Sequence, residues 1–111
     1  MPKMSAPQEL AAIAPKLVEV SNEVLFADIW QRPGLSPRDR SLVTVSALVS
    51  LYRGEQLGYH LGLALDNGLS VEELSEAITH LAFYSGWPNA MSAITQLRKI
   101  AEERESSRAS P

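Results

Sequence analysis

The sequence predicts an all-α fold of about six helices. Apolar residues recur every three or four positions through most of the chain, as they do on the buried face of a helix. Start signals such as Ser-Pro and Ser-x-x-Glu, and glycines suited to helix ends, separate these stretches. The length of 111 residues suits one compact domain. We therefore assign residues 1–104 to a single domain and residues 105–111 to a polar tail that we expect to be disordered.

The N-terminal part of the chain predicts two helices. Leu17, Val20 and Val24 follow near-helical spacing. Pro15 should interrupt this stretch, because proline is tolerated in the first turn of a helix and not in its interior. The prediction is a short helix before Pro15 and a longer one after it, ended by a turn at Pro33-Gly34.

The third helix has the clearest start. Ser36 can cap it, Pro37 suits its first position, and Asp39 falls in the first turn, where a carboxylate is favoured. The segment "SLVTVSALVSLY", residues 41–52, then carries apolar or small residues on nearly every face. A helix of that composition is normally buried on all sides. A buried strand is the alternative, since Val and Thr are plentiful, but the length and the capping signal favour a helix.

Three further helices complete the predicted fold. The fourth begins after Gly54 and runs to about Asp66. Ser70 followed by Glu73 is a capping-box pattern, which predicts the start of the fifth. The last helix begins at Trp87, and its apolar residues recur at helical spacing.

Composition and charge exclude several classes of partner. The net charge of −3 argues against a nucleic-acid-binding surface, and no basic run exceeds two residues, so a polybasic membrane patch is absent. The longest apolar-rich run is too short to span a bilayer, and the N-terminus lacks an apolar signal core. We therefore expect a cytoplasmic protein that binds neither nucleic acid nor membranes. A chain of this size buries a limited core alone, so subunit association is expected to add to it.

The absence of cysteine excludes disulfides, thiolate metal sites and thiol peroxidase chemistry. The two histidines, His60 and His80, lie far apart without metal-binding spacing, so neither a metal nor another cofactor is expected. His80 lies four residues after Glu76 and is most simply a solvated pair with it.

His60 is the main candidate for chemistry. It lies four residues after Gln56 and seven after Arg53, so a helix through this segment places all three on one stripe. Glu55 and Tyr59 project from the adjacent face. These polar groups could line a pocket, with His60 in acid–base catalysis. The alternative is that His60 is a hydrogen-bonded packing residue.

Other candidates also have two readings. Arg40 enters an otherwise buried segment, where a buried guanidinium needs either a protein carboxylate or an anionic substrate. Trp30 and Tyr84 border predicted turns and can be core residues or ligand-stacking residues. Gly58 and Gly62, inside the fourth helix, can permit close helix approach or subunit contact, or can form a pocket floor.

Three sequence blocks resemble a known family. They are "RPGLSPRDRSLV" at residues 32–43, "YHLGLALDNGLS" at residues 59–70 and "YSGWPNA" at residues 84–90. In this order and spacing, from about Trp30 to Met91, they are similar to the carboxymuconolactone decarboxylase family. The resemblance implies an all-helical subunit that assembles as a homo-oligomer, a trimer or hexamer.

The same superfamily contains alkyl hydroperoxidase D-like enzymes, whose site is a Cys-x-x-Cys pair followed by a His, with a Glu on the preceding helix. In this chain His60 matches that His, Arg53 and Gln56 stand at the two cysteine positions, and Ser41 stands at the Glu position. The chain therefore resembles a cysteine-free member. Thiol peroxidase activity is not expected, because disulfide exchange needs a thiolate.

The resemblance to the decarboxylase branch implies a cofactor-independent enzyme that converts a small carboxylated lactone, such as 4-carboxymuconolactone, during the breakdown of aromatic compounds. Our hypothesis is that His60 is the general acid and that Glu55 orients it or holds its proton. The residues assigned to substrate binding are Arg53, Arg40, Gln56, Trp30 and Tyr84. Two alternatives remain open: a non-catalytic oligomeric binding or assembly module, and an isomerase or hydrolase that acts by proton transfer on a related small acid. A closed apolar environment around His60 would favour the module.

Overall fold

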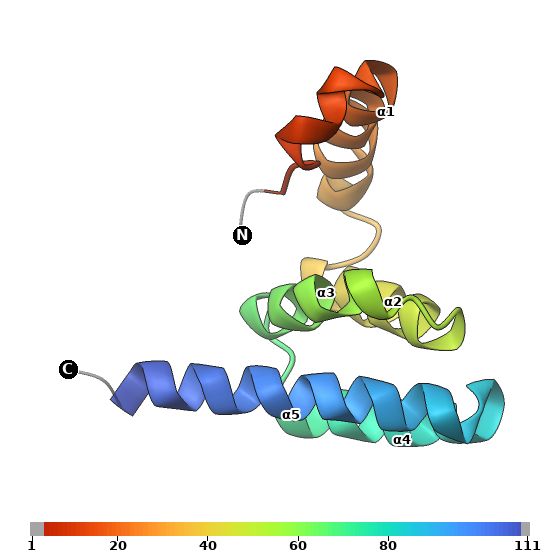
Figure 1. Cartoon of the computed structure of the whole chain (residues 1–111), viewed down its shortest axis with the longest axis vertical. Coiled ribbons are helices and arrows are strands. Elements are labelled where there is room, and N and C mark those ends of the chain that lie inside the picture. The colour runs from red at the N-terminus through yellow and green to blue at the C-terminus, as the bar shows by residue number, and fades with distance from the viewer. Residues whose placement is uncertain (1–3, 110–111) are drawn as a thin grey trace.

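The computed structural model of the chain describes residues 4–109, in which helices are joined by short turns and no strand occurs (Figure 1). The prediction of an all-α fold is therefore confirmed. None of the helices in the described part combines the length and apolar character needed to cross a membrane. The α-helices are α1 (Pro15–Val20), α2 (Pro37–Ser50), α3 (Gly54–Asp66), α4 (Val71–Ser85) and α5 (Trp87–Ala109).

Residues 4–31 form an N-terminal arm that stands away from the other helices (Figure 1). A 3₁₀ helix, Gln8–Ala12, precedes α1, and Pro15 is the first residue of α1, as predicted. A π-helix, Ser21–Phe26, continues α1, and a 3₁₀ turn, Ile29–Gln31, follows it. The spacing of the apolar residues predicts neither the π-helix nor the 3₁₀ turn. The arm is anchored by a small core in which Met4 and Trp30 of the arm pack with Leu63 of α3.

The other four helices form two packed layers. In Figure 1, α2 and α3 lie in one layer and α4 and α5 in the other. Each of these helices contacts its neighbour in the same layer. Across the layers, α2 packs against α4 and less extensively against α5, and α3 packs against α5. The shared core is apolar and includes Val45, Val49, Leu57, Leu61, Leu74, Ile78 and Leu97. This core holds α3, and therefore His60, in a fixed orientation.

The predicted helix starts are confirmed by hydrogen bonds. The Oγ atom of Ser36 accepts a bond of 3.0 Å from the backbone N–H of Asp39 at the start of α2. At the start of α4, Ser70 and Glu73 make both bonds of the capping box, each 3.0 Å long. The Glu73 carboxylate also pairs with Arg38 of α2, which links the two layers.

The prediction that α2 is buried on all sides is wrong for the single chain. Only the face with Ser41, Val45 and Val49 is buried, because α3 and α4 cover one side of the helix. On the opposite side Val43 is 60% exposed and Leu51 is 62% exposed.

The C-terminal segment differs from the expected disordered tail. Helix α5 continues to Ala109, so most of residues 105–111 is helical. Arg104 fastens this end to α3: its Nη1 donates to Asp66 at 2.9 Å and its Nη2 donates to the carbonyl of Gly62 at 3.0 Å. A Cβ atom added at Gly58 would lie 3.2 Å from the side chain of Gln96, so close approach of α3 to α5 explains this glycine.

The capping box of α4 gives a direct test of the fold. We expect Ser70→Ala to lower the free energy of unfolding by about 1 kcal/mol, because the backbone N–H of Glu73 loses its acceptor. Urea denaturation measures this change. Ser107→Ala, at an exposed position of α5, is the matched control and should cause no loss of stability. Equal stability of Ser70→Ala and wild type would contradict the role of the cap.

Candidate active site

His60 lies on the side of α3 that faces the arm, between two aromatic rings. The indole of Trp30 stacks on the imidazole, with ring centroids 6.3 Å apart and an angle of 15° between the planes. The ring of Tyr59 meets it edge-on at a centroid distance of 5.1 Å. Stacked and edge-on contacts of this kind restrict the orientation of the imidazole ring.

The two nitrogens of His60 have different environments. Nδ1 is buried and has no hydrogen-bond partner in the structure. The side chain is half-buried, and burial lowers the pKa of His60 from its usual value of 6.5, because desolvation disfavours the charged ring. His60 is therefore neutral at pH 7, and Nε2 is the nitrogen left to exchange a proton with a ligand.

A cavity of about 680 Å³ lies between the arm and α3, with His60 in its lining. This volume is typical of a site for a small molecule. Helix α3 contributes Glu55 and Gln56 from one turn and Tyr59 and His60 from the next, because residues four apart lie one above the other on a helix. The arm contributes the opposite wall, formed by Ser5, Ala6, Pro7, Gln8, Leu10, Leu17, Val18, Ser21 and Phe26.

The lining of this His60 cavity is largely apolar. Among its lining residues Glu55 is the charged side chain, and neither Lys nor Arg is present in the described part of the wall. Its other polar groups come from Ser5, Gln8, Ser21, Gln56, Tyr59 and His60. A ligand here would meet one histidine, a few neutral hydrogen-bonding groups and an apolar arm.

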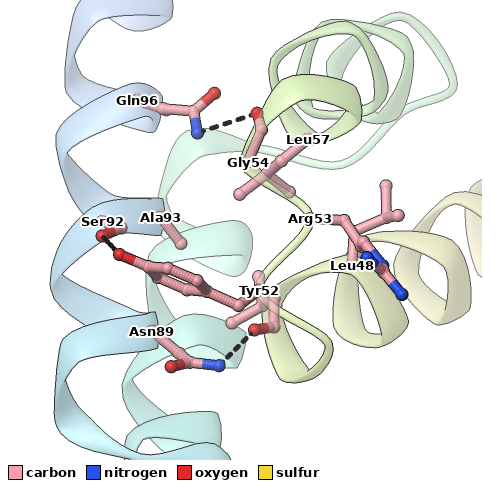
Figure 2. A pocket seen from close by; sticks show the side chains of 10 residues that line it. Leu48, Tyr52, Arg53, Gly54, Leu57, Asn89, Ser92, Ala93 and Gln96 are labelled. Atoms are coloured by element: carbon pink, nitrogen blue, oxygen red, sulfur yellow. Dashed lines mark hydrogen bonds between the residues drawn. The ribbon is translucent and has the colours of Figure 1, made fainter.

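Arg53 lies away from this cavity. It precedes α3 and lines a separate cavity of about 240 Å³ between the α2–α3 turn and α5 (Figure 2). Figure 2 shows its guanidinium on the side of Leu48, away from α5. Two amides of α5 hold the turn: Asn89 donates to the carbonyl of Val49 at 2.8 Å, and Gln96 donates to that of Gly54 at 3.2 Å. These bonds satisfy backbone carbonyls at the end of α2 and the start of α3, and they position the backbone that precedes α3.

Arg40 is half-buried beside Trp30. The two residues line a hollow of about 170 Å³ on the outer side of α2, which shares no lining residue with the His60 cavity. Nη2 of Arg40 donates to the carbonyl of Arg32 at 3.0 Å, and Nε is buried without a partner. Trp30 therefore contacts His60 and also forms part of the wall next to Arg40.

The remaining candidates lie elsewhere. Tyr84, on α4, is 79% exposed, and its ring lies 5.0 Å from that of His80. Ser41, at the position of the superfamily Glu, is buried and accepts a bond of 3.0 Å from Asn67. Across the described residues, no group of three or more His, Asp or Glu side chains is placed to hold a metal ion.

Four of the predicted site residues therefore lie together: His60, Glu55 and Gln56 line the cavity, and Trp30 stacks on His60. The other three lie outside the His60 cavity: Arg53, Arg40 and Tyr84. The arm wall was missed by sequence reasoning. The sequence marks Leu10, Leu17 and Phe26 only as apolar. Apolar character alone does not indicate which other helix these side chains face.

Comparison with known proteins identifies similar sequences. Residues 15–99 match the carboxymuconolactone decarboxylase family. A 4-carboxymuconolactone decarboxylase of Acinetobacter baylyi is 35% identical over 78 residues, which cover 70% of this chain and 58% of that protein. A nitrosuccinic acid decarboxylase of Metarhizium robertsii is 35% identical over 85 residues, which cover 77% of this chain and 59% of that protein. The matches therefore span somewhat less than three fifths of each relative's length.

The lowered pKa of His60 predicts how stability depends on pH. In the unfolded chain this pKa returns to about 6.5, so between that value and the lower folded value the unfolded chain binds more protons. The free energy of unfolding should therefore fall as the pH is lowered through this window. Urea denaturation at several pH values, from about 7.5 down to about 5, measures the dependence.

His60→Gln should be less sensitive to acid than wild type, because the titrating ring is gone. His80→Gln, the same change at an exposed histidine, should keep the wild-type dependence. The same pH dependence in His60→Gln and wild type would contradict burial of a neutral His60.

Proposed function

Since the chain belongs to the carboxymuconolactone decarboxylase family, we propose that it is a cofactor-independent decarboxylase acting on a small carboxylated compound in the His60 cavity. The observation that carries the proposal is a half-buried histidine, with one nitrogen available, in the wall of a cavity of about 680 Å³. This cavity supports an enzyme over a packing role for His60, which would be expected in a closed environment.

The reaction has a simple requirement. The bond between the substrate carbon and its carboxylate breaks, carbon dioxide leaves, and the electron pair passes into an electron-accepting group of the substrate. Two kinds of group can take up such an electron pair: a lactone conjugated with a double bond, and a nitro group. Groups of these kinds are found in the compounds that name the two relatives. One proton must then be added to the resulting carbanion equivalent, at the carbon next to the electron-accepting group that holds the electron pair, and we assign this step to Nε2–H of the protonated His60.

An apolar wall suits the departing carboxylate. In the bound substrate the negative charge is concentrated on the carboxylate, whereas in the transition state it is spread over more atoms. Removal from water therefore raises the energy of the substrate more than that of the transition state. A cation paired with the departing carboxylate would act in the opposite direction. The absence of Lys and Arg from the described lining of the His60 cavity is consistent with this arrangement.

His60 must gain a proton before it can donate one. In the free protein burial lowers the pKa of His60, so the neutral ring dominates at pH 7. An anionic substrate beside the imidazolium favours the charged ring and raises the pKa again. We therefore propose that substrate binding and protonation of His60 occur together, with a carboxylate that the substrate retains, and not the departing one, as the counter-charge.

The neighbours of His60 have supporting roles in this proposal. Trp30 holds the ring plane, and Glu55 and Gln56 contact the substrate from the preceding turn of α3. The proposal assigns no substrate contact to Arg53, Arg40 or Tyr84, because these side chains do not line the His60 cavity. The first compound to test is 4-carboxymuconolactone, followed by nitrosuccinic acid, which the names of the relatives indicate.

Turnover of these two compounds tests the proposed activity. We expect wild type to release carbon dioxide from one of them, and His60→Gln to lower kcat by about 10²- to 10⁴-fold, the contribution typical of a positioned general acid. His80→Gln should retain wild-type activity, because that ring is not in the cavity. No turnover by wild type would contradict the substrate class. Full activity of His60→Gln would contradict the assigned residue.

The pH dependence of kcat/KM tests the direction of proton transfer. This parameter reports ionisations of the free enzyme and free substrate. If His60 must be protonated to act, kcat/KM should fall as the pH rises through the pKa of free His60, which lies below 6.5. A kcat/KM that instead rises through this region would show that His60 acts as a base.

A further inference from the structure

Arg40 has no carboxylate partner among residues 4–109. Its side chain is half-buried in the first turns of α2. Nη2 donates to the carbonyl of Arg32 at 3.0 Å, whereas Nε is buried without an acceptor. Asp39, the next carboxylate along the chain, pairs with Arg38 instead. Because a guanidinium that is partly removed from water needs an anion or several acceptors, the binding capacity of Arg40 is left unfilled by the described part of the protein.

Other arginines that line cavities differ in this respect. Arg38 lines a cavity between α2 and α4 and pairs with Glu73, which lines the same cavity. Arg98 lines a cavity between α4 and α5 and pairs with Glu102, again in the same lining. Arg53 is exposed, so water reaches its guanidinium. In these three cases the positive charge is already paired or solvated.

The hollow beside Arg40, which we call the Arg40 hollow, has a volume of about 170 Å³. Its described lining contains neither Asp nor Glu. The hydroxyl of Thr44, the other polar group, donates to the carbonyl of Arg40 at 2.8 Å, so its proton is already used. The rest of the wall is apolar or aromatic: Leu25, Ile29, Trp30, Leu35 and Val43. One positive charge in such a wall suits a ligand with one negative charge and an apolar body.

We propose that the Arg40 hollow binds a small aromatic monocarboxylate, at a site separate from the His60 cavity. A guanidinium can offer a carboxylate two parallel N–H groups, and the indole of Trp30 in the wall suits a flat ring. The volume limits the ligand to about one ring, since sites for drug-sized molecules begin at about 300 Å³. A phosphate dianion would meet a single cation and a largely apolar wall, so it fits less well.

Trp30 joins the Arg40 hollow to the candidate active site. The hollow and the His60 cavity share no lining residue, but the indole that lines the hollow stacks on the imidazole of His60. An acid bound beside Arg40 would therefore restrict the side chain that restricts His60. The bound acid is a ligand distinct from the substrate, and its binding does not depend on the decarboxylase activity.

Tryptophan fluorescence tests the proposal, with benzoate as the probe. The chain has two tryptophans, so Trp87→Phe leaves Trp30 as the only indole. In this background benzoate should change the emission of Trp30 in a saturable way, and Arg40→Gln should weaken its binding about tenfold or more, because a charged hydrogen-bonding partner is lost. Benzamide, which has a similar shape and no charge, should bind as weakly to the background as benzoate binds to Arg40→Gln. Arg98→Gln, at an exposed position of α5, should bind benzoate as the background does. No saturable change in the background, or equal affinity in Arg40→Gln, would overturn the proposal.

His60→Gln in the same background separates the two sites. It should still bind benzoate, because His60 does not line the Arg40 hollow. Binding that is lost in His60→Gln and kept in Arg40→Gln would place the acid in the His60 cavity. That result would overturn this proposal and leave the proposed decarboxylase untouched.

Val43→Glu tests the same hollow with Arg40 left in place, and therefore decides the matter if Arg40→Gln does not fold. Val43 lines the hollow, is 60% exposed and lies three residues after Arg40, so a carboxylate there can pair with the guanidinium. Benzoate should then bind about tenfold more weakly or not at all. Thr79→Glu, which adds the same charge at an exposed position of α4, should leave benzoate binding unchanged. Unchanged affinity in Val43→Glu would overturn the proposal.

Discussion

The contact between Trp30 and His60 is the interaction on which the candidate site depends. Trp30 is the point at which the arm enters the fold: it packs with Met4 and Leu63 and stacks on the imidazole of His60. Trp30 does not line the cavity itself, but its packing with Leu63 holds the arm, which forms one wall of the cavity, on α3. The side chain of His60 is half-buried, and burial lowers the pKa of the ring. The arm and the candidate histidine are therefore joined at this aromatic contact.

The helices could be predicted because their signals are local. Ser36 and the Ser70–Glu73 box mark helix starts by bonds within one turn, and both were found where expected. The walls of the site could not be predicted, because spacing along α3 says which residues share a side but not what faces them. The spacing predicts Gln56 and His60 on one stripe of α3 and Glu55 and Tyr59 on the adjacent face, and all four line one cavity. Arg53, expected on the stripe of His60, instead lies before α3 and lines a different cavity.

The apolar character of α2 and of the arm has two different consequences. On the arm, apolar residues face the His60 cavity and would keep water from a bound carboxylate. On α2 they face outward, although the sequence predicts burial on all sides. The core of a chain of this size is limited, and in the single chain this face of α2 stays uncovered. Trp30 lies between the two regions: it contacts His60 and borders the hollow beside Arg40 on α2.

In the mechanism that we propose, an anion in the cavity controls the protonation of His60. The most direct measurement is a pH titration of the His60 and His80 ring signals by nuclear magnetic resonance, with and without succinate as an unreactive carboxylate. We expect a pKa for His60 below 6.5 in the free protein, a higher value with succinate, and no comparable change at His80. A His60 pKa that starts at or above its usual value, or that does not rise in the presence of saturating succinate, would contradict coupling between anion binding and protonation.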